Sequence, residues 1–327
     1  MSFSFPCDPP RRVTVVAPAR LHLGFMDPDA SLGRRFGSIG VTLEGVATRI
    51  QFIRAERLVV EGVGGARAGR CAARFLEALQ LPGSAHLVID QAIPEHVGLG
   101  SGTQMDLAVG MGLARLFGLN PSLEDIVMFS GRGARSGIGI AAFREGGFIV
   151  DGGRGSNTRI PPTLARLPFP ADWRLILVFD ARGQGLHGAE ERAAFRNLAP
   201  FRAEDAAHLC HLLLMRALPA LAENDIGIFG AAIGELQRAV GDHFAPAQGG
   251  RFTSPAVAEA LAWLEKHGAA GVGQSSWGPT GFGLLATPQR AEKLLREIRA
   301  AFADHPALHF QAVACRNSGA TVECDPA

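Results

Sequence analysis

Lysine is almost absent from this chain, although arginine is common. Among the 32 basic residues the only lysines are Lys266 and Lys293, which both lie in the C-terminal half. A mechanism that needs a lysine beside the glycine-rich segments of the N-terminal half is therefore excluded. The 31 acidic residues leave a formal net charge of +1, so overall charge gives no reason to expect nucleic-acid binding. The arginines still allow local sites for a small anion.

Cysteine and long apolar runs are also scarce. The five cysteines are scattered and form no CxxC pair, which favours reduced thiols. The longest apolar stretch, residues 212–221, contains Arg216 and Pro219 and is far shorter than the ~20 residues that cross a bilayer. The first residues, MSFSFPCDPPRR, lack the apolar region of a signal peptide. We therefore expect a soluble cytoplasmic protein without a membrane partner.

The composition of the chain indicates a globular protein of about two domains. Its 327 residues are 47% hydrophobic and 19% charged, which is too apolar for a disordered chain. Strand-like and helix-like patterns alternate in both halves, and prolines concentrate in residues 159–173. We therefore predict an α+β protein with a linker at 159–173, an N-terminal domain at 1–165 and a C-terminal domain at 166–327.

Short runs rich in valine and isoleucine predict strands, and apolar residues at helical spacing predict helices. The expected strands are residues 13–17, 46–53, 58–61, 86–90, 175–179, 281–286 and 308–315. The expected helices are residues 69–81, 101–117, 190–197, 203–218, 255–267 and 288–302. Ser122 and Asp125 have the spacing of a capping box that opens one more helix.

Residues 93–104, IPEHVGLGSGTQ, place closely spaced glycines at the start of a predicted helix. Glycine lets backbone N–H groups approach an anion and the helix dipole adds to the attraction, so this segment is a candidate phosphate-binding loop. Ser101 and Thr103 could add hydroxyl donors or a magnesium ligand. The segment lacks the lysine of a P-loop, and a structural turn that only caps the helix is the alternative. The residues assigned to the phosphate are Gly98, Leu99, Gly100, Ser101, Gly102, Thr103 and Gln104.

Two further segments combine glycine with polar residues. Residues 271–283 offer candidate substrate contacts at Gln274, Ser275, Ser276 and Trp277. Residues 17–27, APARLHLGFMD, offer candidate catalytic groups at Arg20, His22 and Asp27. The alternatives are close backbone packing in the first segment and a hydrogen-bonded core histidine in the second.

These three segments, in this order, resemble the signature motifs of the GHMP superfamily of galactokinases, homoserine kinases, mevalonate kinases and phosphomevalonate kinases. The resemblance covers the whole chain. It implies an N-terminal domain of the ribosomal-protein-S5-like type, a C-terminal ferredoxin-like domain and an active site between them.

Four segments look more specifically like the β-ribofuranosylaminobenzene 5′-phosphate synthase branch of this superfamily. They are residues 98–104, 131–139, 146–153 and 185–191. Enzymes of that branch join phosphoribosyl pyrophosphate (PRPP) to 4-aminobenzoate or 4-hydroxybenzoate and release pyrophosphate and CO₂, in tetrahydromethanopterin biosynthesis. The resemblance therefore implies a homodimeric transferase that uses Mg²⁺, and the sequence does not choose between the two acceptors.

The resemblance gives each motif an expected role. Pyrophosphate would lie on the loop at residues 98–104 with a bridging Mg²⁺. Ser101 and Asp106 are the candidate metal ligands, although Asp106 could instead be a solvated helix residue. Arg20 and His22 would bind the benzoate carboxylate, and Asp27 would orient them or act on the amine. The ribose 5-phosphate would bind to Arg132, Arg135 and Ser136, although these arginines could instead face solvent.

An ATP-dependent small-molecule kinase of the same superfamily is the alternative function, and a non-catalytic relative is a third. Several such kinases place an aspartate base after a Ser-Gly pair, whereas residues 136–140, SGIGI, contain no acid. The second serine of their GLGSS motif is Gly102 here. His208 and His211 share a helix face, but without a third metal ligand at a recognisable spacing we expect them to pack.

Overall fold

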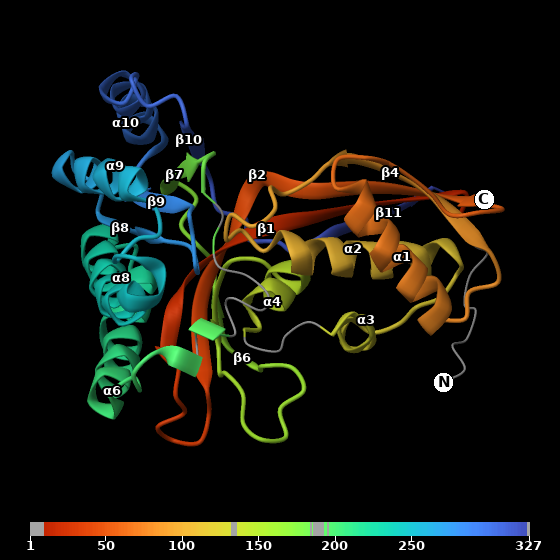
Figure 1. Ribbon diagram of the computed structural model, residues 1–327, viewed down its shortest axis with the longest axis horizontal. Helices are drawn as coiled ribbons and strands as arrows, with labels where there is room; N and C mark the ends of the chain where they lie inside the picture. Colours follow the sequence, from red (N-terminus) through yellow and green to blue (C-terminus); the bar gives the residue numbers. More distant parts are fainter. Residues whose placement is uncertain (1–9, 132–135, 184, 186–192, 195, 326–327) are drawn as a thin grey trace.

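The computed structural model describes residues 10–131, 136–183, 185, 193–194 and 196–325. A seven-stranded sheet, built mainly from the first half of the chain, occupies one end of an elongated molecule. A four-stranded sheet and its helices occupy the other end (Figure 1). This mixed architecture confirms the predicted α+β fold class.

The seven-stranded sheet is built on two long antiparallel strands, β1 (Arg12–Asp27) and β2 (Phe36–Ala55). Its order is β11-β1-β2-β4-β3, with β5 paired to β2 and β6 paired to β5. The shorter strands are β3 (Val59–Gly62), β4 (Ser84–Gln91), β5 (Phe148–Asp151), β6 (Thr163–Leu167) and β11 (Thr321–Asp325). The expected strand at 13–17 is only the start of β1. The alternation that marks a strand is lost further along it, because residues 21–26 are buried on both faces.

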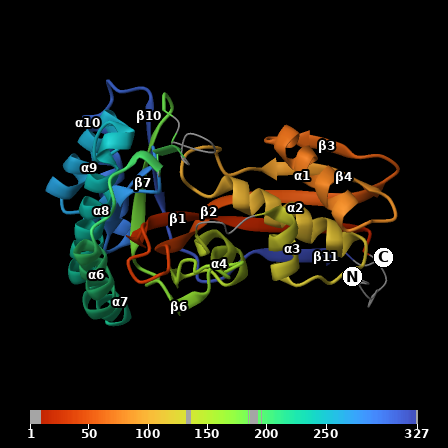
Figure 2. The ribbon, with the colours of Figure 1, turned by 60° about the horizontal axis from the view of Figure 1, so that its bottom comes forward.

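Helix α2 (Ser101–Leu116) is the central helix of this half. It packs on β1 and β2, and α1 (Gly65–Ala78) and α3 (Leu123–Ser130) pack against it in turn (Figure 2). The fourth helix, α4 (Ile138–Arg144), also contacts α2. The predicted capping box is confirmed at the start of α3, where the Ser122 hydroxyl accepts a hydrogen bond from the Asp125 amide at 3.1 Å.

The four-stranded sheet has the order β10-β7-β9-β8 and carries different helices on its two faces. Ile176 and Val178 pack with α9 and α10, whereas Leu175 and Leu177 point to the opposite face and pack with α8. Successive strand residues alternate between faces in this way. The strands are β7 (Arg174–Asp180), β8 (Gly271–Gln274), β9 (Gly281–Leu285) and β10 (Leu308–Val313). The helices are α6 (Ala203–Leu212), the π-helix η1 (Leu213–Ala217), α7 (Leu218–Ala222), α8 (Ile226–Gln248), α9 (Pro255–Lys266) and α10 (Pro288–Ala301).

One hydrophobic core joins the two sheets. It combines Leu21 and Phe25 of β1 and Phe148 of β5 with Phe229 of α8 and Leu177 of β7. The inner half of β1 is therefore held between the sheets, which is where the sequence places Arg20 and His22.

The boundary between the two sheets does not fall at a single point of the chain, whereas the predicted domains 1–165 and 166–327 place it between residues 165 and 166. β6 spans this point and lies inside the expected linker, and the last strand, β11, returns to pair with β1. Helix α8 was not expected from the sequence, and most of the expected helix at 190–197 lies outside the described residues. No helix in the described part of the chain is long and apolar enough to cross a membrane.

Candidate active site

The three sequence segments, residues 17–27, 93–104 and 271–283, meet at the carbonyl oxygen of Gly98. This oxygen accepts hydrogen bonds from Arg20 Nη1 at 2.5 Å and from Ser275 Oγ at 2.8 Å. The Ser275 hydroxyl also accepts a hydrogen bond from the His22 amide at 2.9 Å. Residues from the first, second and last motifs, up to 253 positions apart, thus form one site.

Glycine is required at two positions of this junction. Gly98 has φ +85°, and a Cβ there would lie 2.3 Å from the carbonyl oxygen of Ser275. Gly100 has φ +81°, and its Cβ would lie 3.2 Å from the Arg20 guanidinium carbon. These close contacts explain why both positions are glycine. The close approach of Arg20 to Gly100 also places the Arg20 guanidinium at the start of α2.

The N-terminus of α2 suits an anion. Its N-cap, Gly100, supplies no side-chain hydrogen bond, and the residues of the first turn, Ser101, Gly102 and Thr103, are partly exposed. The first backbone N–H groups of a helix have no partner within the helix, and the helix dipole favours negative charge there. The Arg20 guanidinium next to this turn adds a full positive charge.

Two residues of the predicted phosphate-binding loop, Leu99 and Gln104, are buried, unlike the partly exposed first turn of α2. Leu99 is buried, and its carbonyl oxygen accepts a hydrogen bond from the Arg20 amide at 3.2 Å. Gln104 is buried as well and donates through Nε2 to the Gly139 carbonyl at 2.7 Å. These two residues fasten the loop to β1 and α4.

Ser101 and Asp106 do not come together as a metal site. They are five positions apart on α2, which places them about 140° apart around the helix. The buried Asp106 carboxylate instead accepts a hydrogen bond from Cys71 Sγ at 2.5 Å and lies 3.7 Å from Arg74. Burial and the neighbouring Asp106 raise the pKa of the Cys71 thiol to about 12. No cluster of three acidic, histidine or cysteine side chains able to hold a metal ion occurs within the described residues.

Asp27 does not orient Arg20 or His22. It ends β1, five residues beyond His22, which corresponds to roughly 16 Å along an extended strand. Its carboxylate accepts hydrogen bonds from the amide and the hydroxyl of Ser31, both at 2.7 Å, and from the Asp29 amide at 3.2 Å. Asp27 therefore stabilises the turn that follows β1.

Ser136 belongs to a group of donors around the buried carboxylate of Asp151. Ser136 Oγ and the Gly137 amide donate to Oδ2 at 3.1 and 2.8 Å, and the Gly153 and Ser38 amides donate to Oδ1 at 2.9 and 3.2 Å. Burial raises the pKa of Asp151, while the hydrogen bonds act in the opposite direction. The sequence marks this residue only by its position between two glycine pairs. Arg132 and Arg135 lie outside the described residues.

The last motif also has a structural part. Gln274 Oε1 accepts a hydrogen bond from the Thr253 amide at 2.8 Å, so this side chain connects β8 to the start of α9. Ser276 has φ +55° and donates its amide to the His22 carbonyl at 3.2 Å. The Trp277 ring is buried 4.4 Å from the Phe244 ring, measured between centroids.

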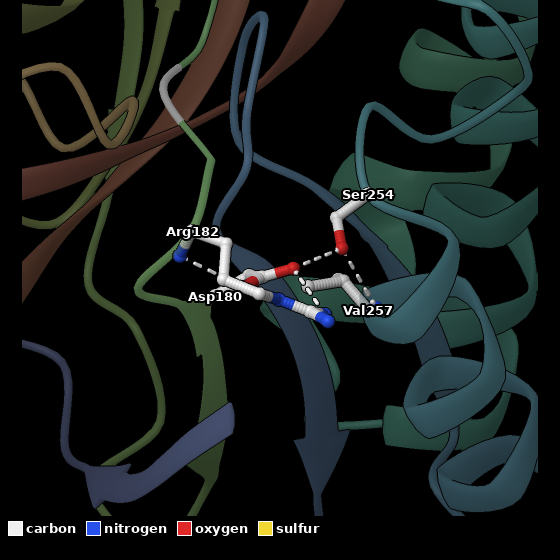
Figure 3. Close-up of polar contacts among 4 residues, drawn as sticks. All are labelled: Asp180, Arg182, Ser254 and Val257. Atoms are coloured by element: carbon white, nitrogen blue, oxygen red, sulfur yellow. Dashed lines mark hydrogen bonds and ion pairs between the residues drawn. The ribbon is translucent and has the colours of Figure 1, made fainter. Parts of the chain in front are cut away.

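A polar network that the sequence did not predict connects the end of β7 to the start of α9 (Figure 3). Asp180, at the end of β7, accepts two hydrogen bonds from the Arg182 guanidinium at 2.9 Å and one from the Ser254 hydroxyl at 2.7 Å. Ser254 in turn accepts from the Val257 amide and so caps α9. The hydrogen bonds from Arg182 and Ser254 lower the pKa of Asp180 to about 2. The network fixes the chain where it leaves β7. Beyond it, Gly185 donates its amide to the carbonyl of His96, in the segment 93–104, at 3.0 Å.

Comparison with known proteins places this fold in the GHMP superfamily. Residues 66–147 match the GHMP kinases N terminal domain, and residues 217–304 match the family described as GHMP kinases C terminal. Homoserine kinase from Cytophaga hutchinsonii superposes over 99% of this chain and 100% of its own, with a TM-score of 0.59 at 15% identity. Mevalonate diphosphate decarboxylase from Staphylococcus aureus superposes over 96% of this chain and 98% of its own, with a TM-score of 0.65 at 16% identity. The chain therefore has the two-domain GHMP fold.

Sequence relatives narrow the family further. Beta-ribofuranosylphenol 5'-phosphate synthase from Archaeoglobus fulgidus is 36% identical over 67% of this chain and 74% of its own length. The protein of the same name from Methanothermobacter thermautotrophicus is 30% identical over 80% of this chain and 85% of its own length. The chain belongs to the beta-ribofuranosylphenol 5'-phosphate synthase family, as the resemblance of its motifs predicts.

Proposed function

We propose that the protein is a pentosyltransferase that joins C1 of PRPP to the ring of a 4-substituted benzoate. The observation that carries the proposal is the junction at Gly98, where Arg20 and Ser275 both donate to the carbonyl oxygen that lies two residues before the N-cap of α2. A site of this kind stabilises the charge that develops on a departing pyrophosphate. Its relatives are synthases of a ribosylated phenol phosphate, which supports the same chemistry.

The reaction balances without an added oxidant or a strong base. The ring carbon that bears the carboxylate attacks ribose C1, and the C1–O bond breaks with its electron pair going to pyrophosphate. The bond from the ring carbon to the carboxylate then breaks, its electron pair restores aromaticity, and CO₂ leaves. No proton has to be removed from that carbon, which agrees with the absence of an acidic residue in the segment 136–140.

Of the two acceptors we favour 4-hydroxybenzoate. Loss of CO₂ from this acid after ribosylation gives a ribosylphenol, the product named in the relatives, whereas 4-aminobenzoate gives an aminobenzene.

We also propose that Mg²⁺ accompanies the pyrophosphate group. Of the two predicted metal ligands, only Ser101 lies at the start of α2, because the Asp106 carboxylate is hydrogen-bonded to Cys71. The proposed mechanism therefore assigns no residue as a metal ligand.

We further propose that the protein acts as a homodimer in the cytoplasm, as the family resemblance implies. Light scattering on purified protein would give about twice the 34.5 kDa chain mass. A monomer that is fully active would contradict the dimer and leave the reaction unaffected.

The decisive experiment measures pyrophosphate release from PRPP with 4-hydroxybenzoate or 4-aminobenzoate in the presence of Mg²⁺. A ¹⁴C-labelled carboxylate follows CO₂. We expect pyrophosphate and CO₂ in equal amounts, with 4-hydroxybenzoate as the preferred acceptor. Arg20→Gln should lower the rate by about 100-fold or more, because a donor to the leaving group is lost. Arg12→Gln, at the exposed outer end of β1 beside Asp325, is the matched control and should be fully active. ATP turnover with a small alcohol, without release of CO₂, would overturn the proposal in favour of a kinase.

A further inference from the structure

The proposed reaction leaves the buried carboxylate of Asp151, at the end of β5, without a part. Four donors surround this carboxylate. The Ser136 hydroxyl and the Gly137 amide donate to Oδ2, and the amides of Ser38 and Gly153 donate to Oδ1. Because a backbone amide can only donate, both carboxylate oxygens have to accept, and the ionised carboxylate satisfies all four groups. Asp151 therefore ties the segment that contains Ser136 and Gly137 to the seven-stranded sheet.

The segment that Asp151 holds leads into α4, and the first turn of α4 lies against the start of α2. Gly137 is the N-cap of α4. Two residues further on, the Gly139 carbonyl accepts the hydrogen bond from Gln104 Nε2 at 2.7 Å. A Cβ at Gly139 would lie 3.1 Å from Thr103 Cγ2, so the backbone of this turn packs closely on the Thr103 side chain. Thr103 and Gln104 belong to the loop at residues 98–104 that we assign to pyrophosphate.

The sheet supports the same turn of α4 from the other side. Ile138 is completely buried, and a Cβ at Gly40 of β2 would lie 2.4 Å from Ile138 Cγ2. Gly40 is the residue of β2 that pairs with His22 of β1. The first turn of α4 thus lies between the strand pair that carries His22 and the start of α2. A displacement of this turn would be passed on to Thr103 and Gln104, because close-packed interiors transmit strain.

We infer that Asp151 is a positioning residue of the proposed pyrophosphate site: it fixes the start of α4, and α4 holds Thr103 and Gln104 in place at the start of α2. The inference rests on the proposed function, because it concerns the site that this function assigns to pyrophosphate. Donors to a developing charge contribute most when they are held in the correct geometry in advance. Loss of Asp151 should therefore weaken the binding of the anion and leave the binding of the benzoate nearly unchanged.

Asp151→Asn tests this role, because asparagine has nearly the same shape but only one acceptor oxygen. Its NH₂ group would face either the Gly137 amide or the amides of Ser38 and Gly153, so that donor faces donor. Binding of inorganic pyrophosphate in the presence of Mg²⁺, measured by calorimetry, should weaken at least about tenfold. The KM for PRPP should rise to a similar extent, whereas the KM for 4-hydroxybenzoate should change less than about twofold.

Asp125→Asn is the matched control. Asp125 also accepts hydrogen bonds from a serine hydroxyl and a backbone amide, both of Ser122 and at 2.7 and 3.1 Å, but at the start of α3. This variant loosens a helix start in the same way and lies outside the path from Asp151 to Thr103. Its affinity for pyrophosphate should stay within about twofold of the wild type. The pair of variants thus separates a general loss of stability from a displaced start of α2.

The outcomes separate this inference from the proposed function. If Asp151→Asn is folded and keeps the wild-type affinity for pyrophosphate and the KM for PRPP, the inference is overturned, while release of CO₂ by the wild type still supports the reaction. If pyrophosphate binding falls as expected but the wild type releases no CO₂, the positioning role stands and the reaction is wrong. If Asp151→Asn does not fold, Gly139→Ala tests the same path from its other end, since the added Cβ presses on Thr103. Weaker pyrophosphate binding is expected in that variant, and unchanged binding would overturn the role of α4.

Discussion

At the scale of single residues, the buried carboxylate of Asp180 is the group with the clearest electrostatic role. Arg182 and Ser254 donate to its ionised form and hold its pKa at about 2, below the ordinary 3.8. We expect Asp180→Asn to lower the free energy of unfolding by about 1–3 kcal/mol near neutral pH, because charge-assisted hydrogen bonds are lost in a buried place. Chemical denaturation followed by circular dichroism measures this difference.

The pH dependence of the same variant tests the assignment. A carboxyl whose pKa is depressed in the folded state stabilises the protein above its ordinary pKa, and this stabilisation is lost as the pH falls through the folded value. The stability gap between wild type and Asp180→Asn should therefore narrow as the pH is lowered from 3.8 toward about 2. Asp304→Asn, at an exposed position, is the control and should show neither effect. A gap that stays constant over this range would contradict the role of the charge.

At the scale of elements, close packing of α2 on β2 depends on glycine. A Cβ at Gly112 would lie 2.2 Å from the Phe52 ring, which is completely buried. Gly112→Ala should destabilise the protein by about 1–3 kcal/mol, because the core has no room for the extra methyl group. Gly69→Ala in α1 is the matched control, since its Cβ would meet only Val60 Cγ2 at an ordinary 3.7 Å. That variant should be unchanged or stabilised by about 0.5–1 kcal/mol, because alanine is the better helix former. Thermal unfolding of the two variants makes the comparison, and equal losses would contradict it.

The same scale shows why the sequence predicts some elements and not others. Helices with a local start signal were predictable: Ser122 with Asp125, Ser254 before Pro255, and Thr287 before Pro288 all cap helices in the structure. Helix α8 was missed because it contains glycines and Pro246, which disfavour helices in isolation. Contacts from distant parts of the chain explain its glycines: a Cβ at Gly230 would lie 2.3 Å from the Ala270 carbonyl oxygen. β11 was missed for a similar reason, because its pairing with β1 joins opposite ends of the chain.

The candidate site was predictable to a similar extent. The resemblance of the motifs to a known family brought Arg20, His22 and Ser275 together correctly. Spacing along the chain could not show that the Asp106 side chain turns toward α1 or that the Asp27 carboxylate is bound to its own turn.

At the scale of the whole molecule, the core that joins the two sheets predicts that they unfold together. Phe229 of α8 lies at its centre, with ring centroids 5.6 Å from Phe148 of the seven-stranded sheet and 5.4 Å from Trp173, which directly precedes β7 of the other sheet. Truncation of a fully buried phenylalanine typically costs about 3–5 kcal/mol. Phe229→Ala should therefore lower the denaturant midpoint of both halves by the same amount.

The readouts are tryptophan fluorescence, which includes Trp173 in this core, and far-UV circular dichroism, which reports both sheets and all helices. Coincident curves in the wild type and in the variant are expected for one cooperative unit. Phe129→Ala, a partly buried residue of α3 outside the joint core, is the control and should cost less. Two separate transitions in the wild type, or a loss in Phe229→Ala confined to one readout, would show that the two halves unfold independently and would contradict a single cooperative core.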